Sequence, residues 1–275
     1  MKRMFLISAI ILAVLAFSSC EKKSGVYTPK KKISRVYEQW TGGNKMLSEK
    51  WTWDGNLLSK IEEYWDGELY GTYRYKYDGK QVSEIIEVDG YTAKFKYDGK
   101  KLNKIEVSYN NFILMTFTPK YTKNNITEIE VVENDVDYNY TKVGKLLRGV
   151  LPENTFKHDA VSNKSTRGTM SSETYTMKFT YESSNIKKKE IIYQDGYTET
   201  FVYTYDKGKN PYNGLLISPT NLFELSKNNV IKEVIEDSEG YYKEYEYDYT
   251  YENNYPTEIT YQNGGYTYTS FITYE

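Results

Sequence analysis

Residues 75–85 read YKYDGKQVSEI, and this short segment contains the building unit of the whole chain. An alternation of aromatic and charged residues, Tyr75-Lys76-Tyr77, leads into Asp78-Gly79, and a second alternating segment follows. An Asp-Gly pair between two such segments is a strong short-range signal for a β-hairpin, because the turn needs positive φ angles and the pair can supply them. The segment therefore predicts a strand on each side of a tight turn.

The same unit recurs along the chain with the pattern aromatic-x-aromatic-Asp-Gly-x-x-apolar-x-charged-Ile. Further copies lie at residues 51–61 and 95–105, and weaker ones at 121–129, 179–191, 225–234 and 249–259. In the weaker copies Asn-containing turns replace Asp-Gly, and Asn tolerates left-handed backbone geometry. A second set of turns joins successive units: Asp89-Gly90, Asp195-Gly196, Glu239-Gly240 and Asn263-Gly264-Gly265. This arrangement predicts one antiparallel meander of about 16 strands.

Side chains within each unit separate into two faces. In residues 73–77 the tyrosines occupy one face of the expected strand, and Arg74 and Lys76 occupy the other. One face of an antiparallel sheet commonly packs while the other meets water. Val82 and Ile85 are spaced by three residues instead of two, which predicts a bulge just after the turn or an apolar residue tucked beneath it.

An open, flat sheet of this size would be unusual, because twist accumulates and exposed edges invite aggregation. We therefore expect the sheet to curl into a closed barrel. A barrel that spans a membrane is the alternative, but its lipid face needs Leu, Val and Phe at mid-strand and excludes charge. Here one face is rich in tyrosine and the other in lysine and glutamate. The expectation is an all-β, water-soluble barrel.

The N-terminus has the features of an export signal. Lys2 and Arg3 precede an apolar run over residues 4–17 that is short for a spanning helix. Small residues lead up to Cys20, the only cysteine, and the stretch resembles a bacterial lipoprotein signal. That resemblance implies removal of residues 1–19 and acylation of Cys20; an ordinary secretory signal with an incidental cysteine is the alternative. Residues 20–32 then read as a tether and residues 33–275 as a single repeat-built domain.

Composition argues against several classes of function. The net charge is −2 at pH 7, with acids and bases interspersed, so we expect no nucleic-acid partner. His158 is the only histidine, and one histidine without a free cysteine removes the usual zinc patterns and catalytic triads. We read His158 as a loop residue and expect no metal, no cofactor and no enzyme activity. A hydrolase that acts on polysaccharide with carboxylates alone is the alternative.

Aromatic residues give the most plausible binding surface. Trp40, Trp51, Trp53 and Trp65 cluster in the first third of the chain, where they could stack against a sugar ring. The competing interpretation is that they form the interior of the first hairpins as cross-strand aromatic pairs. Two interruptions of the repeat are the other places where function is expected, because irregular insertions commonly carry it. The first comprises residues 143–151 and the polar linker 162–172, and the second comprises residues 207–229.

The chain resembles a group of uncharacterised lipoproteins of Bacteroides-type bacteria whose domain has been described as porin-like. The resemblance is carried by the lipoprotein signal, the Tyr-Asp-Gly units, Asn210-Pro211-Tyr212 and the segment 225–230, and its units are also similar to tyrosine-aspartate repeats. It implies a porin-like barrel and an anchor in the cell envelope, and it implies no activity. The absence of Asp after Cys20 favours the outer membrane.

We therefore expect a lipid-anchored envelope protein that is a non-catalytic binding or scaffold module for a glycan or a protein. The lipid is expected to be its only contact with the membrane. A structural role in envelope integrity is a further alternative.

Overall fold

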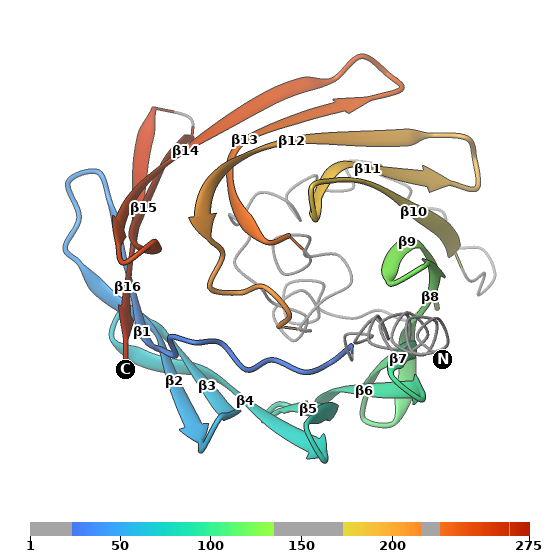
Figure 1. Ribbon diagram of the computed structural model, residues 1–275, viewed down its shortest axis with the longest axis horizontal. Coiled ribbons are helices and arrows are strands. Elements are labelled where there is room, and N and C mark those ends of the chain that lie inside the picture. The colour runs from blue at the N-terminus through green and yellow to red at the C-terminus, as the bar shows by residue number, and fades with distance from the viewer. Residues whose placement is uncertain (1–23, 135–172, 216–225, 264) are drawn as a thin grey trace, which may run out of the picture.

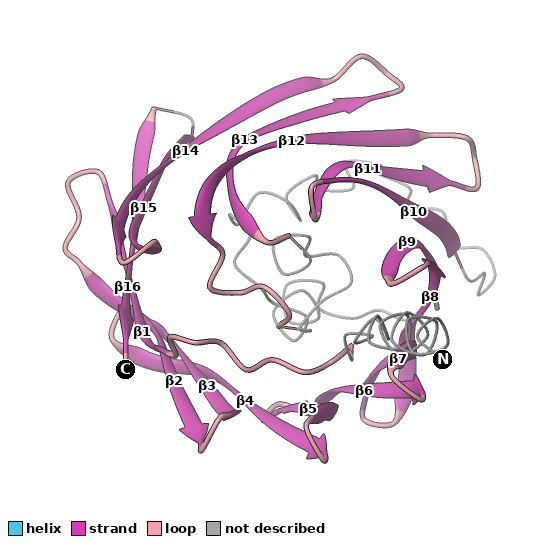
Figure 2. Ribbon diagram, in the orientation of Figure 1, coloured by secondary structure: helices cyan, strands magenta, loops and turns pink. Residues whose placement is uncertain are grey.

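The computed structural model describes residues 24–134, 173–215, 226–263 and 265–275, and every regular element in these residues is a strand (Figure 2). The sixteen strands are β1 (Ile33–Trp40), β2 (Met46–Asp54), β3 (Leu57–Trp65), β4 (Glu68–Asp78), β5 (Gln81–Glu87), β6 (Tyr91–Asp98), β7 (Lys101–Tyr109), β8 (Phe112–Thr122), β9 (Asn125–Glu133), β10 (Glu173–Glu182), β11 (Asn185–Tyr193), β12 (Thr198–Lys209), β13 (Asn228–Asp237), β14 (Tyr242–Glu252), β15 (Tyr255–Asn263) and β16 (Tyr266–Tyr274).

These strands form one closed antiparallel barrel in which each strand pairs with its neighbours in sequence (Figure 1). The ring closes where β1 pairs with β16 in a register that runs from Ile33 opposite Tyr274 to Trp40 opposite Tyr268. The prediction of an all-β meander of sixteen strands closing into a barrel is confirmed. Closure leaves no sheet edge exposed, which removes the usual site of strand-to-strand aggregation.

Two kinds of hairpin alternate between the two ends of the barrel. At the end where the chain enters β1 and leaves β16, which we call the terminal rim, Asp78 pairs with Gln81 and the turn is Gly79-Lys80. At the other end, the distal rim, Trp65 pairs with Glu68 and the turn is Asp66-Gly67. Of the aspartates in the six Asp-Gly pairs of the sequence, only Asp66 has a positive φ, of 50°.

The expectation that both residues of each Asp-Gly pair supply positive φ angles therefore holds only at Asp66-Gly67, and it is wrong at Asp89, at Asp195 and throughout the terminal rim. At the terminal rim the aspartate closes the strand, and the glycine alone adopts left-handed geometry, as at Gly79 with a φ of 60°. Glycine does this without the steric cost that other residues meet.

The predicted bulge after the turn is present. Tyr77 pairs with Val82, but Lys76 pairs with Glu84, so Ser83 is an extra residue in β5. The same shift recurs in the equivalent hairpins of β2/β3, β6/β7, β8/β9, β10/β11 and β14/β15. The bulge changes the alternation once, so that Val82 and Ile85 are both buried although three residues separate them.

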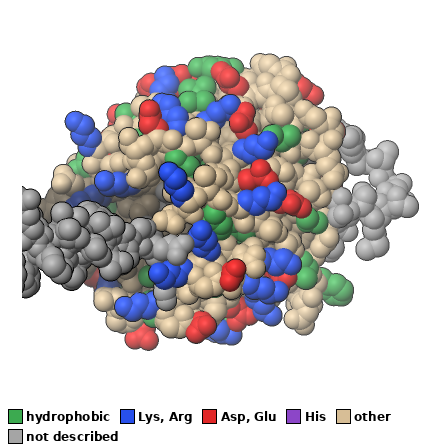
Figure 3. Space-filling view, turned by 45° about the vertical axis from the view of Figure 1, so that its right-hand side comes forward, with side chains coloured by type: hydrophobic (Ala, Val, Ile, Leu, Met, Phe, Trp, Pro, Cys, Tyr) green, Lys and Arg blue, Asp and Glu red, His purple; other side chains and the backbone are tan. Residues whose placement is uncertain are grey.

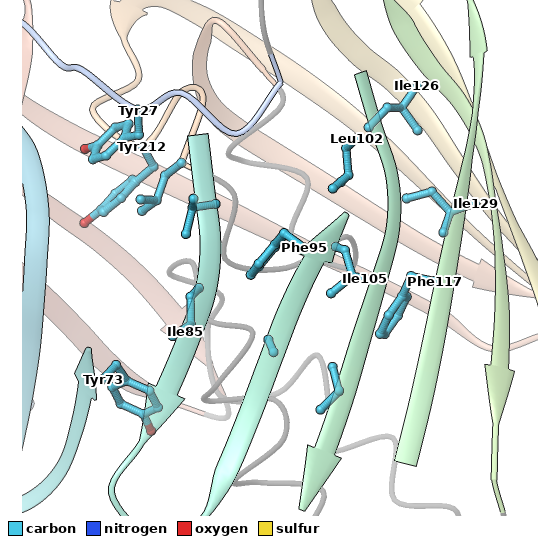
Figure 4. Packing of buried hydrophobic residues seen from close by; sticks show 14 of the residues in the cluster. Tyr27, Tyr73, Ile85, Phe95, Leu102, Ile105, Phe117, Ile126, Ile129 and Tyr212 are labelled. Atoms are coloured by element: carbon cyan, nitrogen blue, oxygen red, sulfur yellow. The ribbon is translucent and has the colours of Figure 1, made fainter. Parts of the chain in front are cut away.

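Apolar and aromatic residues of alternate strand positions are buried inside the barrel. Phe95, Ile105, Phe117 and Ile129 come from the four consecutive strands β6 to β9 and point to the same side of the sheet (Figure 4). With the tyrosines of β4, β12 and β14 they form one continuous cluster. The interior of this barrel is a packed core at these strands, and burial of these large side chains is the main stabilising contribution to the fold.

The outer wall carries the opposite composition. Lysine and glutamate pair across neighbouring strands, as in Lys76–Glu84 at 2.7 Å and Lys120–Glu128 at 2.6 Å. Blue and red side chains are interspersed over this surface in Figure 3. Each exposed pair stabilises the fold by roughly 0–1 kcal/mol, so the pairs matter more for the polarity of the wall than for its stability.

The terminal rim is covered by segments that lie outside the strands. Residues 24–32 cross the opening of the barrel, and the chain after β12 turns inward (Figure 1). The two segments meet where the Tyr27 hydroxyl donates to the Pro211 carbonyl at 2.7 Å. Tyr212 is buried beneath them and packs against Trp51 with ring centroids 6.2 Å apart.

Candidate functional site

One position of the repeat departs from its pattern inside the barrel. In six hairpins of the terminal rim, the third residue after the first buried apolar residue is also buried, and in four of these it is isoleucine: Ile61, Ile85, Ile105 and Ile129. In the β14/β15 hairpin the equivalent Ile259 is half-buried. In the copies that begin at Ile186 and Val230 this position holds Lys189 and Glu233. Lys189 lies on β11 and Glu233 on β13, and these two strands flank β12. A positive side chain therefore enters the core on one side of β12 and a negative side chain on the other.

Lys189 is almost completely withdrawn from solvent, at 3% exposure. Its Nζ lies 3.6 Å from the centroid of the Phe201 ring, its cross-strand partner on β12. A desolvated cation over an aromatic face is stabilised by the negative face of the ring. Burial lowers the pKa of Lys189 to about 8, while the carboxylates of Glu233 and Glu199 act in the opposite direction.

Glu233 is 2% exposed and lies opposite Tyr203 in the β12–β13 register. Its Oε2 accepts a hydrogen bond of 3.3 Å from the Tyr247 hydroxyl, and its Oε1 has no hydrogen-bond partner within the described parts of the chain. Burial raises the pKa of Glu233, an effect that Lys189 and the two tyrosine hydroxyls oppose. The same burial raises the pKa of both tyrosines.

This cluster combines the charges and shifted pKa values that mark many active sites, but it lacks access. Functional clusters with perturbed pKa values usually lie in a cleft, and structural ion pairs shift pKa values as well. A general acid must reach its substrate, and a glycosidase needs a second carboxylate across that substrate. Glu233 has lysine and tyrosine as neighbours and almost no exposed surface, so the hydrolase alternative gains no support here.

The four predicted tryptophans separate into two pairs. Trp51 is 6% exposed and stacks with Trp53 beneath the segment that crosses the terminal rim, where the Trp53 indole donates to the Ile33 carbonyl. Trp40 and Trp65 lie at the distal rim with ring centroids 6.0 Å apart, 38% and 57% exposed. The structure therefore does not bring all four onto one surface, and only Trp40 and Trp65 remain available as an aromatic platform.

Exposed apolar side chains concentrate at this same distal rim. Besides Trp40 and Trp65, they are Leu69, Tyr70, Val88, Tyr109, Phe112, Ile113, Tyr242 and Tyr266, all at the ends of strands that meet the distal turns. Contiguous exposed apolar patches on a protein surface commonly mark interaction sites.

The loop that carries Trp40 is held in place by several contacts. The Gly43 amide donates to the Trp40 carbonyl, and the Gln39 side chain donates to the Gly43 carbonyl at 2.9 Å. Thr41 is hydrogen-bonded to Thr267 on β16 through its backbone amide. Gly43 also lies so close that a β-carbon there would be 2.7 Å from the Trp40 ring. The exposed ring thus has a fixed position before any ligand arrives.

The two predicted interruptions have different outcomes. Of residues 207–229, the described part packs into the barrel: Asn210, Tyr212 and Leu215 are buried, and the Asn210 side chain donates to the Ser226 carbonyl. Residues 143–172, His158 among them, lie outside the described residues, as does Cys20. Their predicted roles stay predictions.

Across the described ranges, no group of three or more His, Cys, Asp or Glu side chains is placed to hold a metal ion. Within those same ranges there is no helix with the length and apolar character needed to cross a membrane.

No protein-family model matches the chain, and no curated protein matches it in sequence. Solved structures do match. A porin-like protein from Bacteroides vulgatus ATCC 8482 aligns over 90% of this chain and 99% of its own, with a TM-score of 0.53 and 11% identity. A porin-like protein from Bacteroides uniformis ATCC 8492 covers 92% and 100%, with a TM-score of 0.49 and 12% identity. At this identity the likeness concerns the fold alone.

Proposed function

We propose that this protein is a lipid-anchored barrel of the bacterial cell envelope that acts as a non-catalytic binding module. The observation that supports this role is the distribution of side chains over the barrel. Charged pairs cover the outer wall, apolar residues fill the wall's inner side, and exposed aromatic residues gather at the end away from the chain's entry. Such a barrel is suited to present a rim to a partner in water.

The anchor in this proposal is Cys20, acylated after removal of residues 1–19. Several acyl chains on one cysteine hold a protein in a membrane far more firmly than a single chain does. Detection of incorporated fatty acid on the natural chain, and its absence in Cys20→Ser, tests the anchor. A processed chain that carries no acyl group would contradict it.

The binding surface in this proposal is the distal rim around Trp40 and Trp65, with a glycan or a protein as ligand. Rigid aromatic side chains supply large contact area at low cost in conformational entropy, and loss of one central aromatic commonly costs about 2 kcal/mol or more of binding free energy.

The test compares binding by the natural chain and by Trp40→Ala/Trp65→Ala on glycan and protein arrays. We expect the double variant to lose affinity for any ligand found by at least about tenfold. Tyr242→Ala is the matched control, because Tyr242 is an exposed aromatic residue on the same rim but three strands away from β1. Turnover of a polysaccharide on the array, or equal loss in both variants, would contradict the proposal.

A further inference from the structure

The terminal rim carries a set of lysines whose side chains have no protein partner. Lys30, Lys80, Lys100, Lys123, Lys207 and Lys227, here called the lysine rim, are all exposed. Lys80, Lys100 and Lys123 lie in three consecutive hairpin turns, and Lys30 lies in the segment that crosses the opening. Within the residues that the structure describes, none of the six ammonium groups has an ion pair, a side-chain hydrogen bond or an aromatic ring beneath it.

Lysines of the outer wall are in the opposite situation. Lys60 and Lys50 share Glu62, Lys96 and Lys104 share Glu106, and Lys232 bonds Glu244 at 2.6 Å. At these positions the positive charge of the wall is therefore neutralised within the protein. The ammonium groups of the lysine rim can be neutralised only by solvent ions or by an external anion.

Charge is also segregated along the barrel axis. The described turns of the distal rim and the strand ends beside them carry Asp66, Glu68, Asp89, Asp195 and Glu239, and Lys45 lies at this end as well. The terminal rim has acids too, at Asp54, Asp78, Asp98, Glu182, Asp206, Glu252 and Glu275, but its lysines outnumber these seven, since Lys31, Lys32, Lys101 and Lys209 lie at the same end as the six of the lysine rim. A chain with a net charge of −2 thus presents a basic end and an acidic end.

The chain enters the barrel at the basic end. The Ser24 amide donates to the Lys100 carbonyl at 2.8 Å, and the Val82 amide donates to the Gly25 carbonyl. Ser24 lies four positions after Cys20, and a fully extended chain of that length spans at most about 14 Å. An acylated Cys20 would hold the lysine rim within a few Debye lengths of the bilayer surface, where attraction between charges is still felt.

We propose that the lysine rim seats the barrel on the phosphate-bearing headgroups of an anionic bilayer, which turns the distal rim away from the membrane. This inference rests on the proposed anchoring for its biological setting, and it adds a contact between protein and membrane beyond the lipid itself. Juxtamembrane lysines are attracted to anionic lipid individually, and their contributions accumulate when they face the same surface.

The test measures the protein contact without the anchor. The chain from residue 20 onward, with Cys20→Ser so that no acyl group is attached, retains every described residue. It is mixed with phosphatidylcholine vesicles and with vesicles that also contain phosphatidylglycerol, and bound protein is measured by cosedimentation. We expect binding to the anionic vesicles only, and we expect added salt to weaken it.

The decisive comparison uses two charge-reversal variants of equal net charge. Lys80→Glu/Lys100→Glu/Lys123→Glu should reduce partitioning onto anionic vesicles by on the order of a hundredfold, because each lysine contributes about fivefold. Lys45→Glu/Lys94→Glu/Lys178→Glu removes the same charge from exposed lysines of the distal end and outer wall, and should leave most binding intact.

Equal loss of binding in both variants, or no binding by the unaltered chain, would overturn the proposal. Acylation of Cys20 and ligand binding at the distal rim are measured separately on the natural chain. Failure of the lysine rim is therefore distinguishable from failure of the proposed function.

Discussion

At Lys189 an ammonium group lies in a position that isoleucine fills in most copies of the repeat. Taking this charge out of water is unfavourable, and the reduced pKa of about 8 expresses that cost. Against a reference of 10.5 in the unfolded chain, the shift corresponds to a cost on the order of 3 kcal/mol at neutral pH. Glu233 and the Phe201 ring offset part of it.

This cost predicts a pH dependence of stability. Above pH 8 the folded Lys189 loses its proton, while the unfolded chain keeps it up to about pH 10.5, so the natural chain should gain stability as the pH rises through this window. Lys189→Met/Glu233→Gln removes both charges and keeps an acceptor for the tyrosine hydroxyls. It should be at least as stable as the natural chain at pH 7, by about 0–4 kcal/mol.

Urea unfolding at pH 7, 8, 9 and 10 checks this prediction. The stability difference between the double variant and the natural chain should shrink with rising pH, whereas Lys94→Met, at an exposed lysine, should show no such trend. A double variant that is several kcal/mol less stable at pH 7, with a difference that does not change with pH, would contradict it.

The buried pair Lys189 and Glu233 could be predicted from the sequence only in part. The copies at residues 179–191 and 225–234 align so that they end on the apolar residues Ile191 and Val234, whereas the strand register places Lys189 and Glu233 at the isoleucine position. The alignment does not give the depth of these side chains, because the insertion at residues 207–229 separates their strands. The interpretation that tryptophans form the interior of the first hairpins agrees with buried Trp51 and half-buried Trp53, but the residues that cover them, Tyr27 and Tyr212, come from distant parts of the chain and could not be predicted.

At the scale of the hairpin, the tyrosine before each turn has a role that periodicity alone does not reveal. The hydroxyl of Tyr77 donates to the carbonyl of Leu58 in the preceding hairpin, Tyr97 donates to Val82, and Tyr121 donates to Leu102. Tyr205, Tyr249 and Tyr274 make the same type of bond farther around the barrel. The acceptor is each time the first residue of the inner wall after the turn, where the bulge disturbs the ladder.

These bonds link successive hairpins, so removal of one hydroxyl should be felt as a loss of stability. Tyr97→Phe leaves the Val82 carbonyl without its 2.7 Å donor and should cost about 1 kcal/mol in the free energy of unfolding. Tyr266→Phe is the control, because Tyr266 is exposed and its hydroxyl makes no hydrogen bond with the described residues. Urea denaturation distinguishes them, and equal midpoints for both variants would count against a structural role for the tyrosine bonds.

The geometry of the hairpins was easier to predict from the sequence than the hydrogen bonds between hairpins. Spacing alone located the turns and the bulge after them, because both depend on neighbouring residues. The assignment of positive φ to Asp54, Asp78 and Asp98 failed because the pairing register places each aspartate one position earlier, within the strand. Register is set by packing of the inner face, which no single turn specifies.

For the whole molecule, the barrel has its apolar and charged faces in the reverse order of a membrane-spanning barrel. The two strand faces predicted from the sequence lead to the same arrangement once the sheet closes, because burial favours the tyrosine-rich face on the inside and leaves the charged face in contact with solvent. What covers the terminal rim could not be foreseen, because Tyr27 and Pro211 meet across 184 positions of sequence. Closure of the barrel places both ends of the strand meander at the same rim. The different charge of the two rims follows from the residues in the turns at each end.

This reversed arrangement predicts that the protein does not form a channel, despite its likeness in fold to porin-like proteins. Lys94, Lys178 and Lys232 lie near the middle of β6, β10 and β13 and face outward, and a lysine at the bilayer midplane costs about 2–4 kcal/mol. Several such residues around the ring make insertion unfavourable by far more than the ion pairs recover. The chain from residue 20 onward, added to planar phospholipid bilayers with and without acylation at Cys20, should produce no stepwise current. Reproducible unit conductances would show that lipid contacts the charged wall after all, and would require a different assignment of the outer face.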